Sequence, residues 1–237
     1  MRINATALVA GRGAFGLGSA FSALALGAIG IAIVSGRCAA AADMTVSVLD
    51  GAGHGVAGIV IIAQPETAVP ERHIARRAIM DQQHMQFVPR ILVIQTGTGV
   101  DFPNSDQIQH QVYSFSAPKS FKLSLYAGHK YPPIVFDRPG LVTLGCNIHD
   151  GMIGYIYVTD SPFFGRSDAS GQLQLHGLPP GGYTLTAWHP QMQEAGENTL
   201  RLQFTLAENE HSTPVLHLTR PLRTEMTHDG DKRWTDY

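Results

Sequence analysis

The chain has 237 residues, of which 44% are hydrophobic and 15% are charged, and its formal net charge at pH 7 is −2. Such a chain can fill one large core or two small ones. It has no basic patch, which excludes nucleic acid as a partner. The 25 glycines and 14 prolines, without any long heptad pattern, predict an all-β chain built from short strands.

Residues 1–42 are typical of a secretory signal peptide. Arg2 and Arg12 precede an apolar run over residues 14–34, and a string of alanines ends at Ala42. We predict cleavage after Ala42 and a periplasmic location. Because the run is long enough to span a bilayer, an uncleaved membrane anchor is the alternative. Cleavage removes three arginines, which leaves 14 basic and 19 acidic residues, a net charge of about −5 and no stable membrane insertion.

Residues 44–65 contain the first predicted strands. Residues 44–49 alternate polar and apolar side chains, residues 50–55 form a glycine-rich turn, and residues 56–63 are almost continuously apolar. This pattern predicts a hairpin with one well-buried arm.

Residues 140–158 contain side chains with metal-binding chemistry. Cys146, His149 and Met152 lie within seven residues of one another, between segments that alternate like strands. Of the two cysteines, Cys38 falls in the predicted signal peptide. Cys146 is then a single thiol outside the cytosol, where an unused thiol is open to oxidation. Binding a metal would give this thiol both a use and protection.

A thiolate, two imidazoles and a distant thioether suit copper, because sulfur holds Cu(I) and nitrogen satisfies Cu(II). The second imidazole is expected from His110, the only histidine in the strand-turn-strand stretch 100–115. The rival interpretation is a cysteine nucleophile activated by a histidine. The sequence offers no orienting partner or oxyanion loop for such a pair, so we predict no catalytic residues and no enzymatic activity.

The spacing Cys-x2-His-x2-Met, followed by Ile-Gly-Tyr-Ile-Tyr-Val, resembles that of amicyanin, a cupredoxin or blue copper protein. The segments Phe102-Pro-Asn-Ser-Asp, His110-Gln-Val-Tyr-Ser-Phe and Gly145-Cys-Asn-Ile-His-Asp are similar to those of methylamine-utilisation-type, plastocyanin-like proteins. The resemblance covers roughly residues 78–160 and implies a cupredoxin Greek-key β-sandwich there. It also implies one type 1 copper ion whose ligands are His110, Cys146, His149 and Met152.

The resemblance further implies one-electron transfer between redox partners, such as a c-type cytochrome or a periplasmic dehydrogenase. His110, Cys146 and His149 would form a trigonal plane, with Met152 as the weak axial ligand. In most small blue copper proteins an asparagine follows the upstream histidine, whereas this chain has Gln111. The resemblance therefore supports the assignment of the four ligands better than it supports any assignment of the residues around them. Two alternatives are copper storage, delivery or sensing, and a structural envelope protein with a vestigial copper site.

Residues 161–220 resemble a carboxypeptidase-regulatory or transthyretin-like small β-sandwich. The resemblance rests on the stretches 167–171, 178–183 and 185–190. The side chains expected to face inward are Tyr183, Leu185 and Ala187. His189 is expected to have a structural role, because one histidine without nearby partners is a weak motif.

The segment 161–220 has few strands for a complete sandwich. We therefore predict that the hairpin over residues 44–65 pairs with it, and that the copper domain over residues 78–160 is inserted between the two. Residues 221–237 are mostly polar and charged and are predicted to form a mobile tail.

Overall fold

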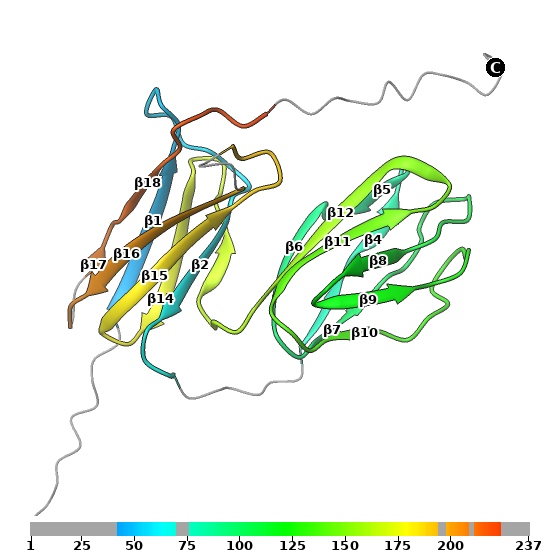
Figure 1. The fold of residues 1–237 in the computed structure, drawn as a ribbon, viewed down its shortest axis with the longest axis horizontal. Helices are drawn as coiled ribbons and strands as arrows, with labels where there is room; N and C mark the ends of the chain where they lie inside the picture. Colours follow the sequence, from blue (N-terminus) through cyan, green and yellow to red (C-terminus); the bar gives the residue numbers. More distant parts are fainter. Residues whose placement is uncertain (1–41, 70–75, 194–197, 209–210, 224–237) are drawn as a thin grey trace, which may run out of the picture. The chain divides into compact units, whose positions relative to one another are not determined.

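The computed structural model describes residues 42–69, 76–193, 198–208 and 211–223. The regular elements in these ranges are strands, and none is a helix (Figure 1), which confirms the predicted all-β class. In the same part of the chain, no helix has the length and apolarity needed to cross a membrane. Except for Ala42, the predicted signal peptide lies outside the described residues, as does the tail from residue 224 onward.

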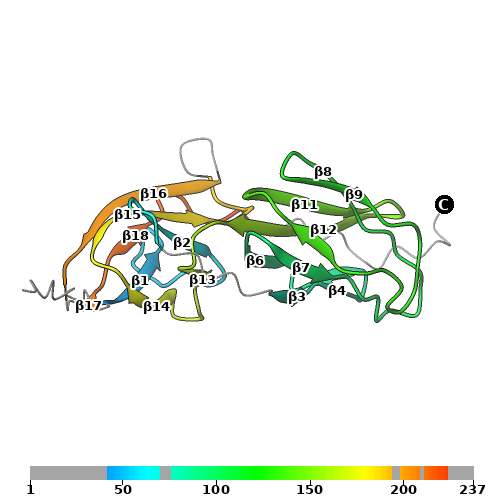
Figure 2. The same ribbon diagram turned by 90° about the horizontal axis from the view of Figure 1, so that it is seen from below.

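Residues 77–159 form a first β-sandwich. Its strands are β3 (Arg77–Ile79), β4 (Asp81–Gln83), β5 (Gln86–Val88), β6 (Ile91–Gln95), β7 (Thr98–Asp101), β8 (Tyr113–Ser116), β9 (Lys119–Lys122), β10 (Ile134–Phe136), β11 (Gly140–Cys146) and β12 (His149–Thr159). The larger sheet has the order β6-β12-β11-β8-β9, the smaller sheet has the order β10-β7-β3, and β4 pairs with β5. β12 runs antiparallel to β11 (Figure 2) and parallel to β6.

The strands outside this segment form a second β-sandwich. They are β1 (Ala42–Leu49), β2 (Val60–Pro65), β13 (Phe164–Arg166), β14 (Gln172–Leu178), β15 (Gly181–Trp188), β16 (Thr199–Leu206), β17 (His211–Ser212) and β18 (Val215–His217). One sheet has the order β14-β1-β17, with β18 also paired to β1, and the other has the order β13-β2-β15-β16. Tyr183, Leu185 and Ala187 are buried in its core. The segment that forms the first sandwich thus lies between β2 and β13 in sequence.

The hairpin predicted over residues 44–65 is wrong, because β1 and β2 belong to different sheets. β1 pairs with β14 and β18, whereas β2 pairs with β13 and β15. The apolar run in β2 explains the difference, since both of its faces are buried. On one face, Ile61 and Ala63 pack in the core of the second sandwich. On the other face, Val60 and Ile62 pack in a separate cluster with Trp188. Such a strand suits the interior of a sheet covered on both faces, and β2 lies between β13 and β15 in its sheet.

His189 follows β15, and we expect it to make the stability of the protein depend on pH. Its Nδ1 accepts a hydrogen bond from the amide of Gln191 at 3.3 Å. Burial, followed by the positive charges of Arg166 and Arg90, lowers the pKa of His189 to about 4. In the unfolded chain the ring takes up a proton near pH 6.5. The folded state therefore loses stability as the pH falls from about 6.5 to about 4, because only the unfolded state binds the proton over that range.

Since His189 is partly exposed, we expect a loss of about 1–2 kcal/mol in the free energy of unfolding rather than the full value implied by the shift. Urea denaturation at about pH 7 and about pH 5 measures it. Replacing His189 by glutamine should flatten this part of the pH dependence. An equal slope in the variant and the parent protein would show that His189 is not its source.

Candidate metal centre

Cys146 and His149 face each other at the tip of the hairpin formed by β11 and β12. Only Asn147 and Ile148 separate them, and the register shifts between Gly145 and Cys146. Such an irregularity re-aims the side chains next to it. Cys146 points into the sandwich with 3% of its surface exposed, whereas His149 is half-buried.

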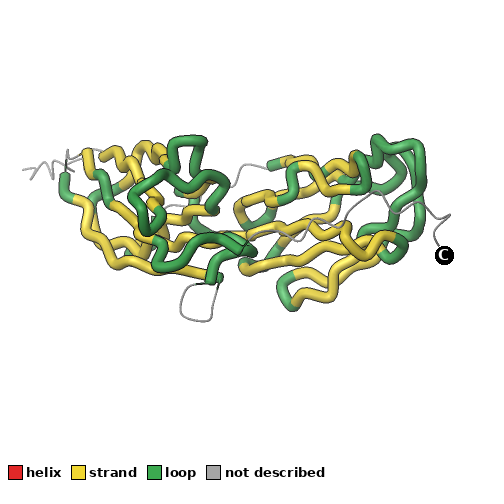
Figure 3. Tube along the Cα trace, turned by 90° about the horizontal axis from the view of Figure 1, so that it is seen from above, coloured by secondary structure: helices red, strands yellow, loops and turns green. Residues whose placement is uncertain are grey.

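His110 comes from the loop between β7 and β8, one of the loops that gather at an end of the first sandwich (Figure 3). Its backbone N–H and C=O exchange two hydrogen bonds of 3.0 Å with the backbone of Tyr126. The side-chain amide of Asn104 donates to the carbonyls of Ile108 at 2.9 Å and Tyr126 at 2.7 Å. The His110 side chain is completely buried. The loop therefore fixes the imidazole before any ligand binds.

Three donor atoms converge from these two segments. Cys146 Sγ lies 3.9 Å from His110 Nδ1 and 3.7 Å from His149 Nδ1. The two Nδ1 atoms are 3.1 Å apart. Within the described ranges, His110, Cys146 and His149 are the one group of at least three His, Cys, Asp or Glu side chains whose ligand atoms all lie within 4.8 Å of one another.

These separations fit a single transition-metal ion. With bonds of about 2.0–2.1 Å to nitrogen and about 2.3 Å to sulfur, three donors about 120° apart would be separated by about 3.5 Å (nitrogen to nitrogen) and about 3.8 Å (nitrogen to sulfur). The two sulfur-nitrogen distances agree with this geometry, and the shorter nitrogen-nitrogen distance corresponds to a narrower angle. Two imidazoles with one thiolate are the donor set of trigonal copper sites. The residues present therefore fit copper.

Met152, the predicted axial ligand, is buried in the same core as Cys146. Only 1% of its surface is exposed, and both sulfur-bearing side chains line one pocket. The structure thus brings His110, Cys146 and His149 together and keeps Met152 in the core of the same sandwich. The full set of four ligands stays a prediction.

Asp106 orients the His110 ring. His110 Nε2 lies 2.7 Å from Asp106 Oδ2. Burial raises the pKa of Asp106, but hydrogen bonds from the Met85 amide, His110 and the His84 amide outweigh it and hold the pKa below its ordinary value. An ionised Asp106 accepts a hydrogen bond from Nε2–H of His110. The lone pair of His110 Nδ1 is then directed at the candidate ligand atoms of Cys146 and His149.

The His149 ring is also suited to metal binding. Burial, followed by the electrostatic effect of the neighbouring His110 ring, lowers the pKa of His149. A lowered pKa keeps the ring neutral at neutral pH, and the neutral imidazole is the form that ligates metals. His149 differs from the other two donors in its partial exposure to solvent.

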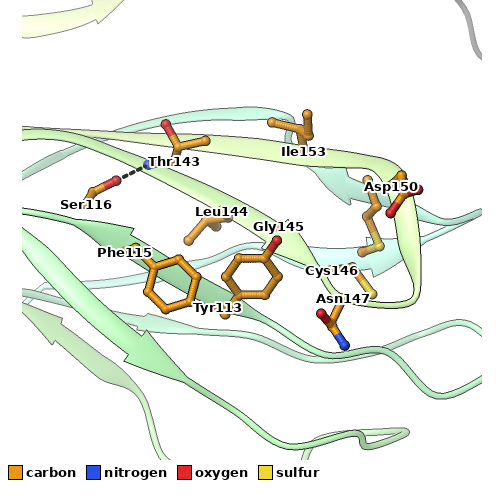
Figure 4. Close-up of a pocket in the computed structure, with 11 residues that line it drawn as sticks. Tyr113, Phe115, Ser116, Thr143, Leu144, Gly145, Cys146, Asn147, Asp150 and Ile153 are labelled. Carbon is orange, nitrogen blue, oxygen red and sulfur yellow. Dashed lines mark hydrogen bonds between the residues drawn. The ribbon is translucent and has the colours of Figure 1, made fainter.

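A pocket of about 420 Å³ lies beside the ligand hairpin (Figure 4). Tyr113 and Phe115 of β8 line it, with their ring centroids 5.2 Å apart, and Phe115 is 80% exposed. A Cβ atom on Gly145 would come within 2.8 Å of the Tyr113 ring. Glycine at this position therefore lets Tyr113 pack against β11 directly before Cys146.

The residues that surround His110 were not predicted from the sequence. Asp106 and Asn104 hold the ring and its loop, and the turn at His84 and Met85 binds Asp106 through two backbone amides. One signal was available, because Asp106 precedes His110 by four residues and an acid at that spacing can reach an imidazole. The two turn residues had no such signal, since they are more than 20 residues away in sequence.

Comparison with known proteins gave matches to solved structures only. No protein-family model and no curated protein matches the sequence. A Cu-containing nitrite reductase from Thermus scotoductus SA-01 is 26% identical with a TM-score of 0.34, over 40% of this chain and 25% of the reductase. A purple cupredoxin from Nitrosopumilus maritimus is 21% identical with a TM-score of 0.31, over 35% of this chain and 99% of the cupredoxin.

A third match is the reduced Cu(I) form of an amicyanin mutant at pH 4. It is 18% identical with a TM-score of 0.32, over 41% of this chain and 97% of the amicyanin. All three matches thus cover less than half of this chain, and this chain spans a quarter of the length of the nitrite reductase.

Proposed function

We propose that this protein is an electron carrier that holds one type 1 copper ion between His110, Cys146 and His149, with Met152 as a weak fourth ligand. The convergence of one cysteine sulfur and two imidazole nitrogens within 4.8 Å carries the proposal. Copper bound there would supply a one-electron couple between Cu(II) and Cu(I), which this mixed donor set supports in both oxidation states.

The surrounding protein suits electron transfer because it holds the donors still. Cys146 lies at the end of a paired strand, and the backbone of His110 is tied to Tyr126. Little rearrangement is then needed when the charge at the site changes. His149 alone among the three donors is partly exposed, so electrons would enter and leave through its ring. A periplasmic location and a c-type cytochrome or dehydrogenase as partner complete the proposal.

Copper storage or delivery is the second candidate, and burial distinguishes it from electron transfer. A delivery site has to release its ion to a partner, whereas Cys146 is 3% exposed and His110 is completely buried. Voltammetry of the copper-loaded protein in the presence of a Cu(I) chelator separates the two. An electron carrier gives a reversible one-electron wave that survives the chelator. Loss of the wave as the chelator removes copper would favour delivery and refute the carrier.

Met152→Leu should keep the colour of the copper-loaded protein and raise its reduction potential. The thiolate makes the strong bond that produces the colour, while the thioether only tunes the balance between the two oxidation states. Leucine fills a similar volume in the core, so we expect a stability change below about 1.5 kcal/mol. Voltammetry and the visible spectrum measure both effects. An unchanged potential would show that Met152 is not a ligand.

A further inference from the structure

The turn between β4 and β5 has an unusual backbone conformation. Its two central residues, His84 and Met85, have φ angles of 52° and 57°. Two-residue hairpin turns with both central residues in the left-handed region favour Asn-Gly, because side chains with a Cβ atom avoid that conformation. Both residues are exposed, so no core packing of their side chains explains the conformation. Such backbone strain persists only where the surroundings fix it.

One carboxylate accounts for this conformation. The amide of His84 donates to Asp106 Oδ1 at 2.6 Å and the amide of Met85 donates to Asp106 Oδ2 at 2.9 Å. The same Oδ2 faces His110 Nε2 at 2.7 Å. Asp106 therefore joins the turn to the ring of a candidate ligand, through three hydrogen bonds to an ionised acceptor, which are stronger than bonds between neutral groups.

A second set of contacts holds the same two segments together. Ser105 Oγ donates to Asp81 Oδ2 at 2.7 Å. The amide of Ser105 donates to the carbonyl of Gln82 at 3.0 Å. These bonds align β4 with the loop that contains Asp106, so that the carboxylate meets the turn amides on one side and the imidazole on the other.

We propose that the His84–Met85 turn is a remote positioning element for His110, with Asp106 as the positioning residue that connects them. The turn amides fix the carboxylate, and the carboxylate selects the Nε2–H tautomer of His110. Nδ1 then presents its lone pair toward Cys146 Sγ at 3.9 Å. The effect on a bound metal rests on the proposed function, whereas the effect on the tautomer does not.

Coupling of this kind acts in both directions. If the turn conformation favours the metal-ready His110 ring, metal binding at that ring must favour the turn conformation to the same degree. Amide hydrogen exchange at His84 and Met85 therefore reports on the metal site from the surface of the protein.

The first test uses NMR on the metal-free protein. The nitrogen shifts of His110 should show the Nε2–H tautomer. In the parent protein, Asp106 accepts hydrogen bonds from three N–H groups, those of the His84 amide, the Met85 amide and the His110 ring. In Asp106→Asn, the side-chain NH2 group faces at least one of these N–H groups and cannot accept its hydrogen bond. We expect the ring to lose its single tautomer and the His84 and Met85 amides to exchange at least about tenfold faster, since each bond to the charged group is lost or weakened.

Asp150→Asn is the matched control, because Asp150 is an exposed acid next to His149. It should leave the tautomer and both exchange rates as in the parent protein. A folded Asp106→Asn variant with the parent tautomer and parent exchange rates would overturn the proposal. So would equal changes in the control.

The second test adds Zn2+, which is diamagnetic and takes the same donors. Zn2+ should slow exchange at His84 and Met85 in the parent protein but not in Asp106→Asn. The double variant H84N/M85G keeps both amides and relieves the backbone strain, so it should unfold at a higher temperature and keep the His110 tautomer. If Zn2+ binds without slowing exchange, the coupling is refuted. If Zn2+ and copper fail to bind the parent protein, the proposed function is refuted while the metal-free test still decides the role of Asp106.

Discussion

Cys146→Ser should abolish the intense visible absorption of the copper-loaded protein and weaken its copper binding more than about 100-fold. Changing a residue that only supports a ligand already costs about 10- to 100-fold in affinity, and Cys146 is the proposed thiolate ligand itself. The hydroxyl of serine is a poor donor to Cu(I), and its bond to Cu(II) lacks the sulfur-to-copper charge transfer. Visible spectroscopy and a competition titration with a copper chelator measure the two effects.

The control for this variant is Asn147→Ser, which changes an exposed residue in the same hairpin tip. It should retain the absorption and bind copper as the parent protein does. Because Cys146 is buried, circular dichroism must show that Cys146→Ser is folded. Strong colour in a folded Cys146→Ser protein would refute the assignment of the thiolate.

Gly154→Ala should lower the free energy of unfolding by about 1–3 kcal/mol, the usual result of adding a methyl group to a filled core. Gly154 lies on β12, two residues after Met152. A Cβ atom there would come 2.8 Å from Cδ2 and 2.9 Å from Cβ of Phe87 on β5. Phe87 is 1% exposed, so it has no solvent-filled space to move into. Urea denaturation measures the loss.

Gly51→Ala is the matched control. Gly51 lies in an exposed turn, and a Cβ atom there meets nothing within 4 Å. We expect this variant to unfold within about 0.5 kcal/mol of the parent protein, as surface substitutions usually do. Equal stabilities for Gly154→Ala and the parent would mean that β5 does not pack closely on β12.

Local patterns predicted the strands well where one face is buried. Tyr183, Leu185 and Ala187 alternate with polar or exposed positions, and all three are buried in the core of the second sandwich. The pairing of β1 and β2 was predicted wrongly because it depends on strands more than 100 residues away. Sequence proximity favours a hairpin, but an apolar run that buries both faces favours the interior of a sheet.

The candidate ligands could be predicted from the sequence for a related reason. Cys146 and His149 lie in one short hairpin, so their spacing alone brings them together. The hydrogen bonds that orient His110 could not be predicted, because the contacts of Asp106 with His84 and Met85 depend on the folded positions of two loops. No periodicity reports on hydrogen bonds between backbone amides and a distant carboxylate.

The visible spectrum of the protein loaded with one equivalent of Cu2+ tests the copper site most directly. A thiolate and two imidazoles around Cu(II) should give an intense charge-transfer band, which should bleach on reduction and return on oxidation with no loss of copper. Only weak absorption from a stoichiometric Cu(II) complex, or a band that does not return after one cycle, would contradict a copper electron carrier built on His110, Cys146 and His149.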